Sequence, residues 1–134
     1  MSSPKSAPAV PVALDPAPQS ALLVKTSSLG DVIHNLPVAT DLRRQFPGLA
    51  IDWVVEESFA AIPRLHPAVR HVIPVALRRW RRQLFAAATR SEWREFRRTL
   101  DARHYDVVLD TQGLIKSGLI AWLAVLVNTF LLLA

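Results

Sequence analysis

Short apolar runs alternate with amphipathic segments along most of this chain. Four of the runs predict strands, at residues 21–25, 51–56, 71–76 and 105–110. Between them, apolar side chains recur every three or four positions, which is typical of helices. We expect helices at residues 31–46, 58–62 and 78–102, and one that starts near Leu114. Alternating strands and helices predict an α/β fold with a parallel, Rossmann-like sheet.

Prolines and capping residues indicate where these elements end. Pro37 lies within the first turns of the first helix and should shift its start or bend it, whereas Pro47-Gly48 should end it. Pro74 lies inside the third strand, which indicates an edge strand or a bulge. The string Thr89-Arg90-Ser91-Glu92 has the form of a capping box, so we expect residues 78–102 to divide there into two helices.

Both ends of the chain depart from this alternation. Residues 1–20 are rich in Pro, Ala and Ser and show no apolar period, so we expect a disordered tail. Residues 118–134 carry no charged side chain, and this apolar tail is close to the lower length limit of a membrane span. We interpret it as a truncated or frameshifted end in preference to a membrane anchor. The globular domain is therefore expected at residues 21–117.

The positive charge of the chain is concentrated in the region predicted to be helical at 78–102. The net charge is +5, and between Arg78 and Arg98 eight arginines stand against two acids, Glu92 and Glu95. The apolar residues of this region form an inward stripe, Trp93, Phe96 and Leu100. Because arginine holds phosphate or carboxylate with two parallel hydrogen bonds, the partner should be anionic. Nucleic acid, anionic lipid and a phosphorylated sugar would all fit.

Metal and thiol chemistry have little support in the composition. The chain has no cysteine, which excludes disulfides and thiolate catalysis within it. Its four histidines lack the spacing of paired metal ligands, so we expect no metal site.

Residues 25–35 follow a buried strand and are rich in small polar side chains. This order predicts a turn that opens a helix, where backbone N–H groups and the helix dipole favour anions. Asp31 would lie there either as an N-terminal helix cap or as a group that meets a ligand. Ser27, Ser28 and Gly30 are expected to shape the loop, with Gly30 permitting a tight turn and close approach of a ligand.

Several polar residues follow the ends of different predicted strands. In a parallel sheet, ligands bind beyond the carboxyl ends of the strands. We therefore expect one rim of the sheet to bring together Asp31, Glu56, Arg78 and the segment Thr111-Gln112-Gly113.

The segment at residues 24–37 closely resembles the start of the lipopolysaccharide heptosyltransferases. Three later segments agree with that family in order and spacing, at residues 51–57, 72–81 and 105–117. The string Arg78-Arg79-Trp80-Arg81 is similar to the type I members, which add the first heptose to Kdo-lipid A. The resemblance covers roughly residues 20–121.

This resemblance implies the N-terminal, acceptor-binding half of a two-domain GT-B glycosyltransferase. Such an enzyme transfers L-glycero-D-manno-heptose from ADP-heptose to Kdo-lipid A with inversion, and it needs neither a metal nor another cofactor. The resemblance also implies a cytoplasmic protein at the surface of the inner membrane, with no nucleic-acid partner. Because the second domain supplies most of the donor site in this layout, we expect the 134-residue chain to be inactive alone.

The resemblance assigns roles to single residues, each with an ordinary alternative. Asp31 matches the catalytic base of the family, and the alternative is a helix cap. An acceptor-binding role is implied for Lys25, Arg78, Arg79, Arg81, Arg82, Gln112 and Lys116. The alternatives are a salt bridge for Lys25, a solvated helix face for the arginines, and turn or helix-start hydrogen bonds for the last two. The rival function is a non-catalytic half-Rossmann module that binds anionic lipid or nucleic acid through its arginines.

Overall fold

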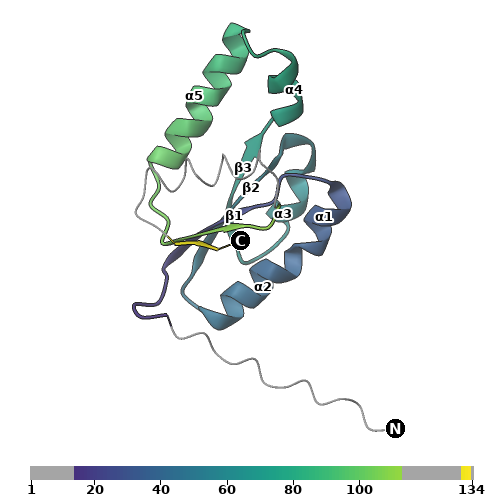
Figure 1. The fold of residues 1–134 in the computed structure, drawn as a ribbon. Helices are drawn as coiled ribbons and strands as arrows, with labels where there is room; N and C mark the ends of the chain where they lie inside the picture. The colour runs from purple at the N-terminus through teal and green to yellow at the C-terminus, as the bar shows by residue number, and fades with distance from the viewer. Residues whose placement is uncertain (1–13, 113–130, 134) are drawn as a thin grey trace, which may run out of the picture.

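A parallel sheet lies at the centre of the computed structural model, which describes residues 14–112 and 131–133 (Figure 1). The strands are β1 (Ser20–Val24), β2 (Ala50–Glu56), β3 (Val69–Val75), β4 (Val107–Asp110) and β5 (Leu131–Leu133). They pair in the order β3-β2-β1-β4-β5, and every pair is parallel. The α/β, Rossmann-like fold expected from the alternation of elements is confirmed.

Helices cover both faces of this sheet. They are α1 (Leu29–His34), α2 (Leu36–Gln45), the 3-10 helix η1 (Glu57–Phe59), α3 (Ala61–Arg64), α4 (Leu77–Arg82) and α5 (Ala87–Asp101). Successive β1 side chains point to opposite faces, so Leu22 packs with Phe96 and Leu100 of α5, whereas Leu23 packs in the core beneath α1 to α3. Figure 1 shows the hairpin of α4 and α5 rising beyond the strand ends on one side of the sheet.

The single helix expected at residues 31–46 is wrong, because two helices meet at Asn35. Asn35 closes α1 and opens α2, and Pro37 stands in the first turn of α2. A proline inside a continuous helix would lack the N–H that bonds to the carbonyl four residues earlier. At the start of a new helix that N–H has no partner to lose. Pro37 therefore marks the start of a second helix, whereas a shifted start or a bend of one helix was expected.

The division of the second helical region is confirmed, but its expected position at Thr89 is wrong. The chain leaves α4 after Arg82 and enters α5 at Ala87. Thr89 is buried inside α5, and its hydroxyl makes no hydrogen bond in the described part of the chain. The expected capping box fails because the carboxylate of Glu92 binds Arg79 and Trp80 of α4 instead. The inward stripe is confirmed, with Phe96 and Leu100 buried.

The edge position expected from Pro74 is also confirmed, because β3 is an outer strand of the sheet. The apolar tail is described only at residues 131–133, which pair with β4. The helix expected near Leu114, and the expectations for Gly113 and Lys116, lie outside the described residues. Within residues 14–112 and 131–133, none of the helices has the length and apolar composition that a membrane span requires.

Candidate functional site at the carboxyl rim of the sheet

Hydrogen bonds join the carboxyl ends of β1, β2 and β4 into one rim. The Lys25 N–H donates to the Val54 carbonyl at 3.2 Å, and the Glu56 N–H donates to the Thr26 carbonyl at 3.0 Å. The Thr111 N–H donates to the Val24 carbonyl at 3.2 Å. The loops that follow these strands are therefore held side by side, and the expected convergence of distant segments on one rim is confirmed.

Asp31 lies exposed at this rim, in the first turn of α1. Its Oδ2 accepts hydrogen bonds from the Ser28 N–H at 3.2 Å and from the Ser28 hydroxyl at 3.1 Å. The Ser28 N–H, followed by its hydroxyl and the charge of Lys25, holds the pKa of Asp31 below its ordinary value of 3.8. The carboxylate is therefore ionised at neutral pH. The cap geometry is present and leaves an exposed carboxylate, so the role of base stays a prediction.

Gly30 does not make the tight turn expected of it. It lies within α1, and a Cβ built there would meet no other heavy atom within 4 Å. The loop bends before the helix, around Ser27 and Ser28, whose expected loop-shaping role fits their position. Close approach of a ligand to Gly30 stays a prediction.

Lys25 follows β1 and points to the neighbouring loop. Its Nζ donates to the Thr111 carbonyl at 3.3 Å. Among the ion pairs of the described residues, none joins Lys25 to Asp31, although its charge helps to lower the pKa of that carboxyl. The salt bridge considered for Lys25 is thus absent from the described residues, and the half-buried ammonium group remains at the rim.

Gln112 holds the loop after β1. Its Oε1 accepts from the N–H groups of Thr26 and Ser27, at 3.1 and 3.4 Å. Its own N–H donates to Oδ1 of Asp110 at 2.9 Å. The side-chain oxygen of Gln112 is therefore engaged within the protein, which favours a positioning role over the acceptor contact implied by the resemblance.

Sequence reasoning missed Asn35 as a residue of this rim. It is buried, and its Nδ2 donates to the Thr111 hydroxyl at 2.9 Å. This bond ties the junction of α1 and α2 to the end of β4. An amide two residues before Pro37, at a helix break, was the available signal.

Glu56 connects the rim to the arginine-rich helix. Its side chain is buried, and Oε2 accepts from the Leu77 N–H at 3.2 Å, at the start of α4. Burial raises the pKa of Glu56, with a smaller contribution from the charge of Glu57, while Leu77 and Arg78 act in the opposite direction. The carboxyl group of Glu56 thus anchors the first turn of α4 beside the rim.

The arginines of α4 divide into two kinds. Arg79 is half-buried and makes a bidentate pair with Glu92, both bonds being 2.7 Å, and a further contact of 3.3 Å with Glu57. These acidic partners raise the pKa of Arg79. The other three are exposed and make no ion pair among the described residues: Arg78, Arg81 and Arg82. Of the four α4 arginines, these three are available to an anionic acceptor, whereas Arg79 holds α4 to its neighbours.

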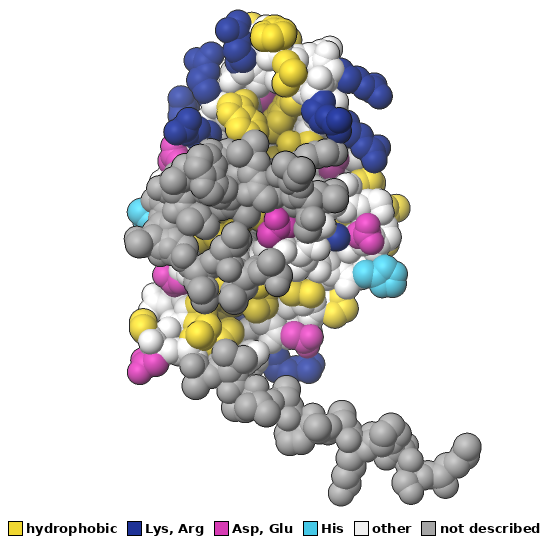
Figure 2. Space-filling model, in the orientation of Figure 1, with side chains coloured by type: hydrophobic (Ala, Val, Ile, Leu, Met, Phe, Trp, Pro, Cys, Tyr) yellow, Lys and Arg dark blue, Asp and Glu magenta, His cyan; other side chains and the backbone are white. Residues whose placement is uncertain are grey.

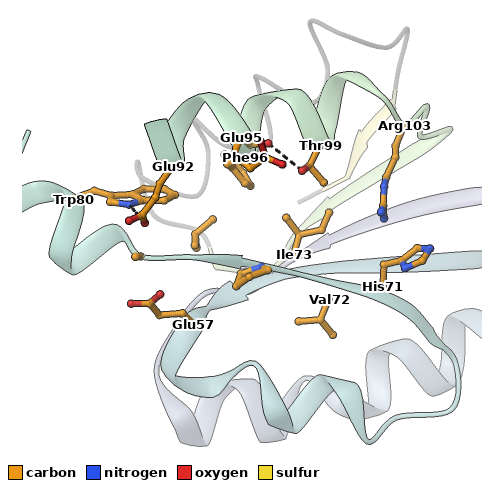
Figure 3. Close-up of a pocket in the computed structure, with 13 residues that line it drawn as sticks. Glu57, His71, Val72, Ile73, Trp80, Glu92, Glu95, Phe96, Thr99 and Arg103 are labelled. Atoms are coloured by element: carbon orange, nitrogen blue, oxygen red, sulfur yellow. Dashed lines mark hydrogen bonds between the residues drawn. The ribbon is translucent and has the colours of Figure 1, made fainter. Parts of the chain in front are cut away.

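A groove of about 390 Å³ runs between the edge strand β3 and α5. Figure 3 shows Trp80 beside Glu92 at one end of this groove, and the carboxylates of Glu57, Glu92 and Glu95 along it. All three carboxylates take part in ion pairs with arginines, and Arg103 also lines the groove, so its charge does not by itself decide what binds there. In the described part of the chain, no three His, Cys, Asp or Glu side chains gather to hold a metal ion.

The fold and the rim together define a Rossmann-like domain of the GT-B glycosyltransferase type. The E. coli heptosyltransferase WaaC with ADP-2-deoxy-2-fluoro heptose superposes with a TM-score of 0.75 and 49% identity, over 84% of this chain and 35% of that chain. The same enzyme with ADP has a TM-score of 0.76, with 34% of that chain covered. A glycosyl transferase of family 9 from Veillonella parvula, at 22% identity and a TM-score of 0.64, shares the fold.

The sequence comparison is more specific. Lipopolysaccharide heptosyltransferase 1 of Pseudomonas aeruginosa is 60% identical over 102 residues, which are 76% of this chain and 28% of the relative. The heptosyltransferase 1 of E. coli K12 is 56% identical over 97 residues, covering 72% of this chain and 30% of the relative. No family model matches the chain. The chain spans less than a third of the length of these relatives, and over the aligned part it belongs to the lipopolysaccharide heptosyltransferase family.

Proposed function

We propose that this chain is the acceptor-binding, N-terminal part of a type I heptosyltransferase. The complete enzyme would move L-glycero-D-manno-heptose from ADP-heptose to Kdo-lipid A. The observation that carries the proposal is the 60% identity to a heptosyltransferase 1, together with an exposed, ionised Asp31 at the rim of the sheet. Because the acceptor is a membrane lipid, the protein would work at the cytoplasmic face of the inner membrane.

In this proposal Asp31 is the general base. An acceptor hydroxyl oxygen attacks the anomeric carbon of the heptose while Asp31 takes the hydroxyl proton. The bond from the anomeric carbon to the diphosphate oxygen breaks, and ADP leaves with its electron pair. Attack from the face opposite the leaving group inverts the anomeric centre. Lys25 lies beside the base and would add positive charge where the acceptor hydroxyl binds.

The anionic groups of the acceptor would meet the exposed arginines of α4. Glu56 anchors this helix and lies next to Arg78, and the Glu56 N–H donates to the Thr26 carbonyl in the loop after β1. Phosphate and carboxylate are the groups that arginine recognises with paired hydrogen bonds. The α4 arginines would therefore hold the acceptor while its hydroxyl reaches Asp31.

A chimera tests this function directly. Residues 20–117 of this chain would replace the matching part of the E. coli heptosyltransferase 1, in a strain that lacks its own enzyme. We expect restored heptose transfer, read as full-length lipopolysaccharide core on gels and by mass. Asp31→Asn should abolish transfer, whereas Asp41→Asn should not, because Asp41 is an exposed α2 residue that pairs only loosely with Arg44, at 3.9 Å. A folded chimera without transfer would contradict the proposal. An affinity for Kdo-lipid A that stays the same after its phosphates are removed would also contradict it.

A further inference from the structure

The turn between α4 and α5 presents two large apolar side chains to solvent. Leu84 is 62% exposed and Phe85 is 91% exposed, at the end of the hairpin that rises from the sheet (Figure 1). Folding normally leaves such side chains uncovered only singly. Here two neighbouring residues are exposed together at the end of the α4–α5 hairpin.

Arginines surround this tip on both helices. Arg81 and Arg82 precede it at the end of α4, and Arg90 and Arg94 follow it in the first half of α5. All four are exposed, and none takes part in an ion pair within the described residues. Figure 2 shows basic side chains on both flanks of this end of the molecule, with hydrophobic side chains between them.

The hairpin that carries the tip is braced from within. Trp80 of α4 packs edge-on against Trp93 of α5, with ring centroids 5.7 Å apart, and Trp93 packs against Phe96 at the same distance. Glu92 binds both Trp80 and Arg79 across the hairpin. The carboxylate of Glu92 is thus engaged below the tip, and the tip keeps a net positive charge.

We propose that Leu84 and Phe85 insert into the interfacial layer of a bilayer that contains anionic phospholipid. The four arginines around them would contact the lipid phosphates. Two apolar side chains surrounded by arginines complement such a surface in both polarity and charge. A nucleic acid would use the arginines and could stack on Phe85, but it offers no apolar layer for Leu84. This proposal rests on the proposed function only in assuming that the protein works at a membrane. It adds the residues that enter the lipid.

Vesicle sedimentation of the 134-residue chain tests the insertion, with neither ADP-heptose nor Kdo-lipid A present. The vesicles are phosphatidylcholine alone or mixed with phosphatidylglycerol. Leu84→Ser with Phe85→Ser should weaken binding to the mixed vesicles about tenfold, as expected for losing two partly inserted apolar side chains. The matched control is Leu65→Ser, since Leu65 is 82% exposed at the end of α3. Equal binding by the double variant and the control would overturn the proposal.

A second measurement places the tip in the lipid without relying on affinity. The chain has no cysteine, so Phe85→Cys and Leu65→Cys each accept a single environment-sensitive fluorophore. With mixed vesicles, the label at 85 should shift to the blue and be quenched by brominated acyl chains, and the label at 65 should do neither. A label at 85 that stays in water while the protein sediments would refute insertion. Every variant keeps residues 118–134, and a failed heptose transfer assay would not change either outcome.

Discussion

The indole N–H of Trp80 donates to the carboxylate of Glu92 at 2.9 Å across the turn that joins α4 and α5. The same carboxylate forms a bidentate pair with Arg79. One acidic side chain therefore fastens the arginine-rich helix to its neighbour. Arg79 is therefore not free to meet a ligand, although it lies in a segment with a net charge of +6.

Glu92→Gln should lower the free energy of unfolding at neutral pH. The Arg79 and Trp80 hydrogen bonds lower the pKa of Glu92 from 4.5 to about 2 in the folded protein. A carboxyl with a lowered folded pKa stabilises the fold above its unfolded pKa, and this contribution is lost as the pH falls through the folded value. The difference in unfolding free energy between parent and variant should therefore shrink as the pH falls from 4.5 to about 2. Urea unfolding at several pH values measures it. Glu95→Gln is the control, because the one ion pair that Glu95 makes among the described residues is with exposed Arg98, at 3.6 Å.

Removal of exposed and engaged arginines should have separable effects. Arg81→Ala with Arg82→Ala should weaken binding of Kdo-lipid A and flatten its dependence on salt, since screening acts on solvent-exposed charge. The unfolding free energy should change little. Arg79→Ala should lower the stability, because Glu92 and Glu57 lose their partner. Calorimetric titration at two salt concentrations and urea unfolding check both outcomes. Equal changes in affinity and stability in the two variants would contradict the division of the α4 arginines into exposed and engaged residues.

Two substitutions of Gln112 separate its possible roles. Gln112→Glu keeps the oxygen atoms that accept from Thr26 and Ser27, but it loses the amide donors. Gln112→Leu loses both. If Gln112 positions the loop, the chimera with Glu should stay active, and the one with Leu should lose kcat. If the amide binds the acceptor, both should show a raised KM.

Asp31 should titrate below its ordinary pKa of 3.8. Carbon-13 NMR of the Asp31 carboxyl measures this directly. Ser28→Ala should move the pKa of Asp31 upward, toward 3.8, because the variant removes the hydroxyl bond of 3.1 Å and keeps the backbone N–H. In the chimera, Asp31→Asn should lower kcat by about 10²–10⁴-fold, as expected for loss of a general base. An unshifted Asp31 would undermine the account of how this loop prepares the carboxylate.

Tyr105→Phe should destabilise the domain without touching the rim. The Tyr105 hydroxyl donates to Oδ2 of Asp52 at 2.8 Å, and Asp52 is fully buried. Burial alone would raise the pKa of Asp52, but hydrogen bonds from Arg70, Tyr105 and Arg103 outweigh it and hold the pKa below 3.8. Loss of a hydrogen bond to a charged group costs about 1.5–3 kcal/mol. Urea unfolding at neutral pH measures it, and a change below about 0.5 kcal/mol would place the variant among ordinary surface substitutions.

The sequence by itself determined the strands β1 to β4 and their order, with helices between them. Apolar runs mark β1 to β4, and Pro74 marks the edge strand, because burial and backbone chemistry act on neighbours along the chain. The convergence of Asp31, Glu56 and Gln112 at one rim also follows from sequence, since all parallel strands end on the same side. The motif around Asp31 gave the resemblance to the heptosyltransferase family.

Only the tertiary structure decided which polar groups meet. Four arginines within five positions look alike in sequence, and a carboxylate thirteen residues beyond Arg79 distinguishes it from the rest. Asp52 gathers Arg70, Arg103 and Tyr105 from up to 53 residues away. The division between α4 and α5 was expected at Thr89 and lies in the turn after Arg82. Glu92 binds Arg79 and Trp80 across this turn, and these contacts form only when the two helices pack. Periodicity reports which face a side chain takes, whereas hydrogen bonds and ion pairs depend on the distance between elements after they pack.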